Sequence, residues 1–309
     1  MPVFVISSGR TGSTFLARLI RDHPRLLCVS DLFEPVGKVP YFDRRTQIDG
    51  PSFFKVLSAP SFPQRIAYWR WKPNAELLFL PEDDNLVSLL LSYTLPFVTE
   101  QPLELYREVK EAVCRFPTRS MADQTIAFFD FLRDRFNKEI WVERTGGSLP
   151  HTREIIQTWP HARFIHNFRD PREVSLSMMT GSFFRLYLEL EKNPDLGTWD
   201  WNYMPPIEEM GSMLNKWVLN AMDAFAQLPK EQHHNLRYED LMSDPEGTLL
   251  SLAQFFLGRD NTDEDRQWAQ TQAARIRPSG PKFDKLEPQE RSALENAVAP
   301  AMDILGYKT

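Results

Sequence analysis

Glycine and hydroxyl residues follow the first apolar run of the chain at a spacing that suits an anion. After 3–6, residues 7–14 read Ser-Ser-Gly-Arg-Thr-Gly-Ser-Thr. Glycines let the backbone approach a ligand closely, and the start of a helix presents N–H groups with a partial positive charge. Arg10 adds a fixed cation. The segment predicts a cradle for a phosphate-like group, with an unliganded polar turn as the alternative. It is not a Walker A loop, because no lysine follows Gly12.

A second candidate site follows the apolar run 164–168. Arg169 ends this run, and open α/β sheets bind ligands at the carboxyl ends of their strands. Ser177 comes eight residues later, within the helix that Asp170 and Pro171 are expected to start. An arginine fork and a hydroxyl together suit one phosphate group. We expect Arg172, in contrast, to be solvated or salt-bridged.

Strands and helices alternate outside the middle of the chain. Strands are predicted at 3–6, 26–29, 140–142, 164–168 and 235–238. Helices are predicted after Gly12, at 152–158, from Pro171 toward Leu190, at 210–228 and after Asp244-Pro245. This alternation is typical of an α/β protein with a parallel β-sheet flanked by helices.

Residues 37–137 follow a different pattern. Prolines divide the segment into short pieces, and aromatic residues are dense there. We interpret it as an irregular, partly helical insertion that covers one face of the core. It can be a helical subdomain with its own small core, a lid over an acceptor, or both.

Composition limits the function further. The 309 residues carry a net charge of −6, which argues against nucleic acid as the main partner. Two cysteines cannot form a disulfide framework, and no Cys/His cluster has zinc spacing. The longest uncharged stretch, 85–99, is too short to cross a bilayer. We therefore expect a cytoplasmic protein with no transmembrane segment.

The chain resembles the sulfotransferases that use 3′-phosphoadenosine 5′-phosphosulfate (PAPS). In that family a loop like residues 8–14 holds the 5′-phosphosulfate, and a strand ending in Arg-Asp-Pro, with a serine eight residues after the arginine, holds the 3′-phosphate. The segment 236–241 is similar to a third motif, whose tyrosine contacts the nucleotide. The resemblance thus implies these cofactor-binding residues: Gly9, Arg10, Thr11, Gly12, Ser13, Thr14, Arg169, Ser177 and Tyr238.

The resemblance also implies a fold. We expect a P-loop-like sulfotransferase fold in a single domain, 1–309, with the insertion on the acceptor side. The basic stretch 275–283 is similar in place to a loop that closes over the 3′-phosphate, which adds Arg277 and Gly280. A solvated loop is the alternative there. Trp69 and Trp71 can stack on adenine or the acceptor, or belong to the core.

The catalytic groups depart from one branch of the family. Cytosolic members take a histidine from a Lys-Thr-His segment, which is matched here by Arg144-Thr145-Gly146, so the base must come from elsewhere. Other branches use a glutamate just after the second strand. Glu34 is therefore the candidate base, with a capping or surface role as its alternative and Asp31 as the rival carboxylate. Arg144 is expected to orient the sulfuryl group.

The predicted reaction moves the sulfuryl group of PAPS to an acceptor hydroxyl and leaves adenosine 3′,5′-bisphosphate. Arg10 would stabilise charge on the leaving phosphate. No metal is required. The acceptor is expected to be a small or carrier-tethered alcohol with apolar character. Two alternatives stay open: a P-loop kinase or phosphotransferase, which requires a loop lysine and a Mg²⁺ carboxylate, and a non-catalytic nucleotide- or carrier-binding domain.

Overall fold

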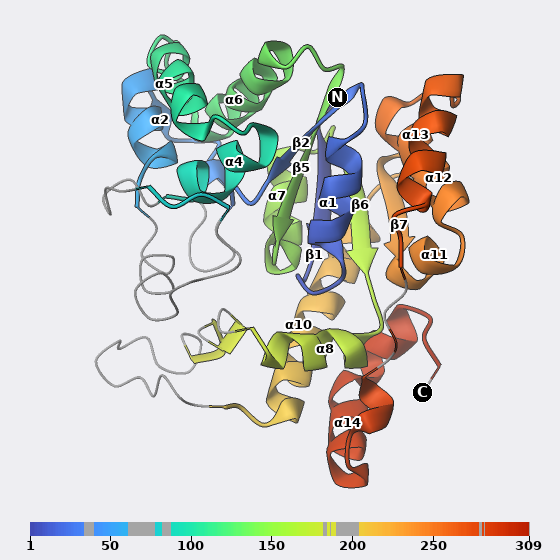
Figure 1. Cartoon of the computed structure of the whole chain (residues 1–309). Coiled ribbons are helices and arrows are strands. Elements are labelled where there is room, and N and C mark those ends of the chain that lie inside the picture. The colour runs from blue at the N-terminus through green and yellow to red at the C-terminus, as the bar shows by residue number, and fades with distance from the viewer. Residues whose placement is uncertain are drawn as a thin grey trace.

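A parallel five-stranded sheet forms the centre of the molecule, in the order β2-β5-β1-β6-β7 (Figure 1). The computed structural model describes residues 1–33, 40–60, 78–81, 88–181, 184–185, 187–189, 204–277, 280 and 282–308. The sheet strands are β1 (Val3–Ser7), β2 (Leu26–Ser30), β5 (Ile140–Gly146), β6 (Arg163–Phe168) and β7 (His233–Arg237). A separate antiparallel pair consists of β3 (Gln47–Ile48) and β4 (Arg119–Ser120).

Helices surround the sheet. Those that follow its strands are α1 (Ser13–Arg21), α7 (Thr152–Thr158), α8 (Pro171–Met179), α10 (Ile207–Phe225), α11 (Tyr238–Ser243), α12 (Pro245–Leu257), α13 (Asp263–Ala273) and α14 (Pro288–Ile304). Those in the insertion are α2 (Gly50–Leu57), α4 (Leu95–Val98), α5 (Pro102–Val113) and α6 (Met121–Arg135), with a π-helical turn η3 (Leu90–Thr94). Short 3₁₀ turns are η1 (Pro40–Phe42), η4 (Leu149–His151), η6 (Lys230–Gln232) and η7 (Phe283–Lys285).

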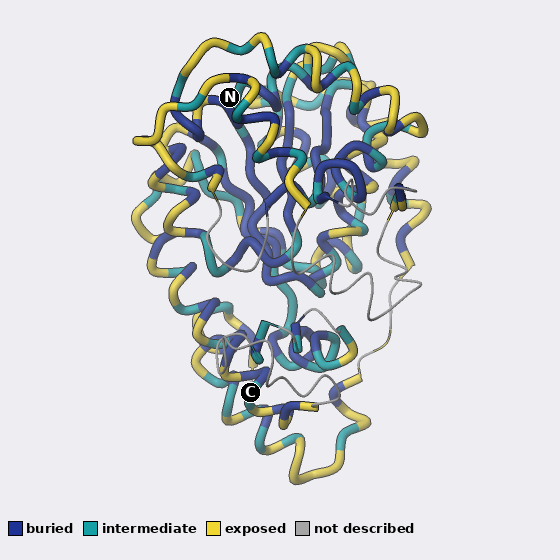
Figure 2. Tube along the Cα trace, turned by 90° about the vertical axis from the view of Figure 1, so that its left-hand side faces the viewer, coloured by how far each residue is buried: buried dark blue, intermediate teal, exposed yellow. Residues whose placement is uncertain are grey.

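Two hydrophobic clusters hold helices against opposite faces of the sheet. On one face, α1, α12 and α13 pack against strand residues such as Val5 and Val142. On the other face, α6, α7 and α10 pack against Phe4 and Trp141. Helix α1 reaches the sheet because Leu16, Leu19 and Ile20 recur at helical spacing and are all buried. Figure 2 shows the strands as a buried layer, with exposed residues on the outer turns of the helices.

All five predicted strands are confirmed, and they pair in parallel. Two of them differ from the prediction by more than one residue at an end. Strand β5 continues through charged residues to Gly146, and β7 begins at His233 and ends at Arg237, so that Tyr238 starts a helix rather than ending a strand. Strand β7 is an edge strand, and its last pair joins Phe168 to Arg237.

The helix predicted from Pro171 toward Leu190 is interrupted: residues 184–185 and 187–189 are helical again after a break. Helix α8 ends at Met179, and Gly181 follows it. Glycine weakens a helix because it loses more backbone freedom than any other residue on folding. Asp170 is the N-cap as predicted, accepting a hydrogen bond from the Arg172 N–H at 2.8 Å. The helix predicted at 210–228 runs instead from Ile207 to Phe225.

The insertion contains regular helices, α2, α5 and α6, and α6 covers part of the sheet next to β2 and β5 (Figure 1). Trp69 and Trp71 lie outside the described residues. No helix in the described part of the chain has both the length and the apolarity that crossing a membrane requires.

Because the five strands are parallel, their carboxyl ends meet at one edge of the sheet. The segments that follow β1, β2, β5, β6 and β7 therefore lie along the same edge, with the loop after β1 in the middle. This is where ligands bind in open α/β sheets.

Candidate active site

The loop between β1 and α1 turns through left-handed backbone. Gly9, Arg10 and Gly12 have φ angles of 76°, 60° and 80°. At the two glycines a Cβ would also lie 2.8 Å from the Phe184 ring and 2.7 Å from the Tyr238 ring, respectively. Arg10 adopts this backbone without being a glycine, and such strained residues cluster at functional sites. The shape of the loop therefore requires glycine at positions 9 and 12.

The first turn of α1 is open to an anion. Its first intrahelical hydrogen bond runs from the Leu16 N–H to the Gly12 carbonyl at 2.9 Å, so the N–H groups of residues 13–15 have no acceptor within the helix. No side chain caps this end, and the first turn contains no acidic residue. The helix dipole adds a partial positive charge at the same place. The geometry agrees with the predicted phosphate cradle.

Neighbouring strands fix the loop. The buried Thr11 hydroxyl donates to Asn167 Oδ1 of β6 at 2.8 Å. On the other side, the Ser7 N–H donates to the Ser148 hydroxyl, just beyond β5, at 3.2 Å. Because both neighbours of β1 hold it, the loop is positioned for a ligand before one arrives.

The two predicted phosphate-binding motifs meet at one contact. Arg10 Nε donates to the Ser177 hydroxyl at 3.0 Å, although the two residues are 167 positions apart in the chain. Arg10 belongs to the loop after β1, and Ser177 lies near the end of α8. Sequence spacing predicted each motif separately, and the tertiary structure brings them together.

Arg169 lies on the β6–β7 side of this loop. Its guanidinium carbon is 4.6 Å from the centre of the Tyr238 ring, and that ring in turn lies against Gly12. Arg169 Nη2 also contacts Glu173 Oε2 at 3.3 Å. The loop after β1, Tyr238 and Arg169 thus form a continuous group of contacts. Arg172 is salt-bridged to Asp170 at 2.7 Å, as expected.

Glu173 is a residue that the sequence analysis missed. Its side chain is only 8% exposed. Besides its contact with Arg169, its Oε1 accepts hydrogen bonds from the N–H groups of Lys282 and Phe283, at 2.6 and 2.8 Å. One carboxylate therefore joins Arg169 to the C-terminal segment. In the sequence, only its position one helical turn after Arg169 could have indicated that Glu173 contacts that arginine.

Two residues of the C-terminal loop, Arg277 and Gly280, were predicted to close over a phosphate. The structure shows no contact of either with the other predicted phosphate-binding residues that it describes. Arg277 is exposed and donates to the carbonyl oxygens of Ala274 and Ile276, at 2.7 and 2.8 Å. A Cβ on Gly280 would meet no atom within 4 Å. In this structure Arg277 caps its own turn.

A second group of polar residues lies on the β2–β5 side of the loop. Arg144 is almost completely buried, and its Nη1 donates to Asp31 Oδ1 at 2.8 Å. Asp31 Oδ1 also accepts from the Gly146 N–H at 2.9 Å, and Oδ2 accepts from the Ser30 hydroxyl at 2.8 Å. Arg144 Nε and Nη2 have no hydrogen-bond partner within the described residues. Buried donors without a partner are uncommon in folded proteins.

The candidate base Glu34 lies outside the described residues. Its rival Asp31 lies in the left-handed region, with a φ of 55°, and its N–H donates to the Arg144 carbonyl at 2.9 Å. Gly146, which replaces the histidine of the Lys-Thr-His segment, donates its N–H to Asp31.

Glu143 is a further residue that the sequence analysis did not single out. It pairs in register with Phe4 and Val29, so its side chain lies on the face of the sheet opposite to that of Arg144. Burial raises the pKa of its carboxyl to about 8, although a hydrogen bond from Thr145 opposes the shift. The carboxyl is therefore neutral at pH 7.

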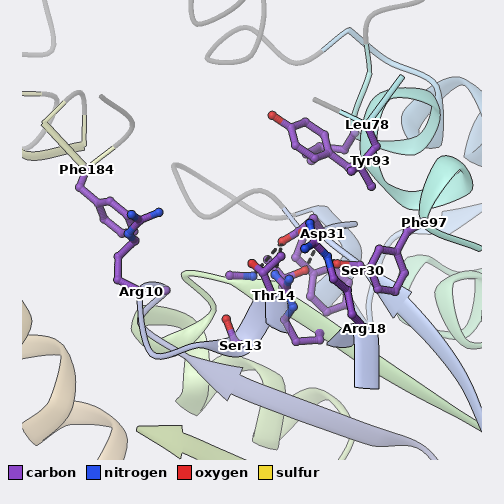
Figure 3. A pocket seen from close by; sticks show the side chains of 16 residues that line it. Arg10, Ser13, Thr14, Arg18, Ser30, Asp31, Leu78, Tyr93, Phe97 and Phe184 are labelled. Atoms are coloured by element: carbon purple, nitrogen blue, oxygen red, sulfur yellow. Dashed lines mark hydrogen bonds and ion pairs between the residues drawn. The ribbon is translucent and has the colours of Figure 1, made fainter. Parts of the chain in front are cut away.

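A cavity of about 370 Å³ opens beside Arg144 and the start of α1. Figure 3 shows Arg10 and Phe184 at one end, and Arg18, Asp31 and Phe97 at the other. Ser13 and Thr14 of α1 lie between them. The volume suits a small organic ligand. The described lining residues include no histidine, and the described part of the chain contains no group of His, Cys, Asp and Glu that could hold a metal.

The edge of the sheet is thus divided in two by the loop after β1. Arg169, Ser177 and Tyr238 lie on the β6–β7 side, where a nucleotide phosphate would find cations and an aromatic ring. The cavity with Arg144 and Asp31 lies on the β2–β5 side. Such an arrangement can hold a phosphorylated donor on one side and an acceptor on the other.

Comparisons with known proteins agree with this arrangement. A model of the sulfotransferase family matches residues 2–263. The structure is similar to the sulfotransferase domain from the curacin biosynthetic pathway, with a TM-score of 0.53 and 16% identity over 100% of this chain and 99% of that one. It is also similar to the sulfotransferase STF9 from Mycobacterium avium, with a TM-score of 0.52 and 16% identity over 99% of this chain and 77% of that one.

These likenesses concern the fold, and no protein of curated function has a significantly similar sequence. The family model, however, spans both predicted phosphate-binding motifs and the arginine–aspartate pair beside the cavity. With its parallel sheet and P-loop-like edge, the chain belongs to the sulfotransferase family.

Proposed function

We propose that this protein transfers the sulfuryl group of PAPS to the hydroxyl of a small or carrier-tethered acceptor. The observation that carries the proposal is the hydrogen bond between Arg10 and Ser177. It brings the predicted phosphate loop into contact with the second predicted phosphate-binding motif, as a nucleotide with two phosphate groups requires. A kinase loop would carry a lysine after Gly12, where this chain has Ser13.

The β6–β7 side is the proposed nucleotide side. Arg169 and Ser177 would bind the 3′-phosphate, which ATP lacks, and Tyr238 would pack against the nucleotide beside Gly12. Support comes from the contacts of Arg169 with Tyr238 and of Tyr238 with Gly12. We assign Arg277 and Gly280 to the same side only by their resemblance to the family's C-terminal loop.

The phosphate loop would act on the leaving group. PAPS supplies the sulfuryl group and leaves as adenosine 3′,5′-bisphosphate. Arg10 and the N–H groups of Thr11 to Thr14 would stabilise the charge that develops on the 5′-phosphate as the sulfur–oxygen bond breaks. Positioning and charge stabilisation of this kind dominate the related phosphoryl transfers.

The β2–β5 side would hold the acceptor. Glu34 would accept the proton of the acceptor hydroxyl as its oxygen attacks sulfur. Arg144 would orient the sulfuryl group, because its two unpartnered nitrogens form a planar fork that fits two oxygen atoms. Apolar residues that line the cavity support an acceptor with an apolar part. These are Leu78, Leu89, Tyr93 and Phe97.

The test is calorimetric titration with adenosine 3′,5′-bisphosphate, with Mg-ATP as the parallel ligand. We expect the bisphosphate to bind tightly and Arg169→Ala to weaken it by a factor of about 10 to 100, the usual cost of one charge-assisted contact. Arg172→Ala is the matched control, because Arg172 is salt-bridged to Asp170. Binding of Mg-ATP without the bisphosphate would refute the sulfotransferase activity and favour a kinase.

A further inference from the structure

The cavity on the β2–β5 side carries excess positive charge. Its described lining includes three arginines, Arg10, Arg18 and Arg144, and one carboxylate, Asp31. A neutral alcohol needs no such excess. The positive charge of the lining therefore indicates the charge of the acceptor as well as that of the donor.

Two of the three arginines are accounted for by the proposed reaction. Arg10 belongs to the phosphate loop and contacts Ser177. Arg144 is paired with Asp31 through one nitrogen, and the proposed function assigns its two remaining nitrogens to the sulfuryl group. Arg18 has no such role. It forms no ion pair within the described part of the chain, and it lies one helical turn of about 5.4 Å beyond Thr14 on α1.

The surroundings of Arg18 are apolar on one side. Figure 3 shows Arg18 at the same end of the cavity as Phe97, with Tyr93 and Leu78 further along the wall. Arg18 itself is exposed, so its charge is accessible to a ligand that enters the cavity. Apolar side chains beside it can pack against the remainder of such a ligand.

We infer that the acceptor is an alcohol that also carries an anionic group, a carboxylate or a phosphate, and that Arg18 binds this group. The apolar part of the acceptor packs against Tyr93 and Phe97, and its hydroxyl lies near Asp31 and Arg144. Within the lining, Arg18 is therefore the arginine that neither the phosphate loop nor the sulfuryl group uses. The inference rests on the proposed function. Only if the nucleotide binds on the β6–β7 side does the cavity on the β2–β5 side hold the acceptor.

The test compares three probes that share an eight-carbon chain: 8-hydroxyoctanoate, its methyl ester and 8-hydroxyoctyl phosphate. Each is titrated into the full-length protein saturated with adenosine 3′,5′-bisphosphate. We expect at least one anionic probe to bind about tenfold more tightly than the ester, as one charge-assisted contact allows. Which of the two anionic probes binds more tightly shows whether the acceptor carries a carboxylate or a phosphate.

Arg18→Gln should bring the ratio of anionic to ester affinity close to one. Arg115→Gln, a change of an arginine side chain that is 74% exposed on another part of the surface, should leave the ratio intact. Equal binding of acid and ester, binding of none of the probes, or a ratio that survives in Arg18→Gln would each overturn the inference. Failure of the bisphosphate to bind in the first step would instead refute the proposed function.

Discussion

At the scale of single residues, Asp31 and Glu34 are the two candidate bases, and the contacts of Asp31 argue against it. Asp31 Oδ1 accepts hydrogen bonds from Arg144 and Gly146, and Oδ2 accepts from Ser30. Both carboxylate oxygens of Asp31 are therefore already engaged by donors of the protein itself. Asp31 is better suited to hold Arg144 in place, which leaves Glu34 as the proposed base.

This distinction predicts different kinetic effects. Glu34→Gln should lower kcat by a factor of about 10² to 10⁴, the usual contribution of a general base, and should leave the affinity for adenosine 3′,5′-bisphosphate unchanged. Asp31→Asn keeps an oxygen that can accept from Gly146, so it should lower kcat less. Steady-state rates with labelled PAPS measure both variants. A larger loss in Asp31→Asn than in Glu34→Gln would reverse the assignment.

At the scale of elements, α8 connects the phosphate site to the C-terminal segment. Its N-terminal end follows Arg169, its first turn carries Glu173, and its last turn carries Ser177. Glu173 contacts Arg169 on one side and two backbone N–H groups, of Lys282 and Phe283, on the other. We therefore regard Glu173 as a positioning residue for Arg169.

Glu173→Gln tests this connection with little change in shape. The amide keeps one oxygen for the two backbone N–H groups, but it presents a donor where Arg169 needs an acceptor. We expect the dissociation constant of the bisphosphate to rise by a factor of about 5 to 10, equivalent to roughly 1 to 1.4 kcal/mol. The measurement is the same calorimetric titration used above.

The control for this variant is Glu295→Gln on α14. Glu295 lies 3.8 Å from Arg172 and carries the same charge near the same helix. It should leave the dissociation constant unchanged. Tighter binding in Glu173→Gln would contradict the prediction and mean that the carboxylate competes with the phosphate for Arg169.

At the scale of the whole molecule, the buried carboxyl of Glu143 in the middle of the sheet links stability to pH. Burial raises its pKa to about 8 from an ordinary value of 4.5. Between these values the unfolded chain loses a proton that the folded chain keeps, so the free energy of unfolding falls as pH rises. The full effect is on the order of 5 kcal/mol.

Glu143→Gln should remove this dependence, because glutamine resembles the protonated carboxyl. Denaturant unfolding at pH 5 and pH 8 measures it: the variant should match the natural chain at pH 5 and exceed it at pH 8. Glu104→Gln, on the exposed side of α5, should change neither value. Parallel pH dependences in the natural chain and Glu143→Gln would show that this carboxyl does not control the slope.

Local patterns predicted much of this molecule. Hydrophobic spacing gave the five strands and the buried stripe of α1, and Asp170 was found as a cap, because strands, helices and caps depend on residues close together in the chain. The two phosphate motifs were recognised for the same reason. The predictions were wrong where contacts between distant residues set the end of an element. Strand β5 continues past its apolar residues because β1 and β2 both pair with it.

The sequence by itself thus determined the elements, the family and the residues expected to bind phosphate. Only the tertiary structure decided which of them meet. The strand order puts β5 between β1 and β2, so Arg144 lies beside Asp31, 113 positions away, while β6 brings Ser177 to Arg10 on the other side. Strand pairing and burial arise from contacts between distant residues. The unpartnered nitrogens of Arg144 and the raised pKa of Glu143 follow from them, and no local pattern records either.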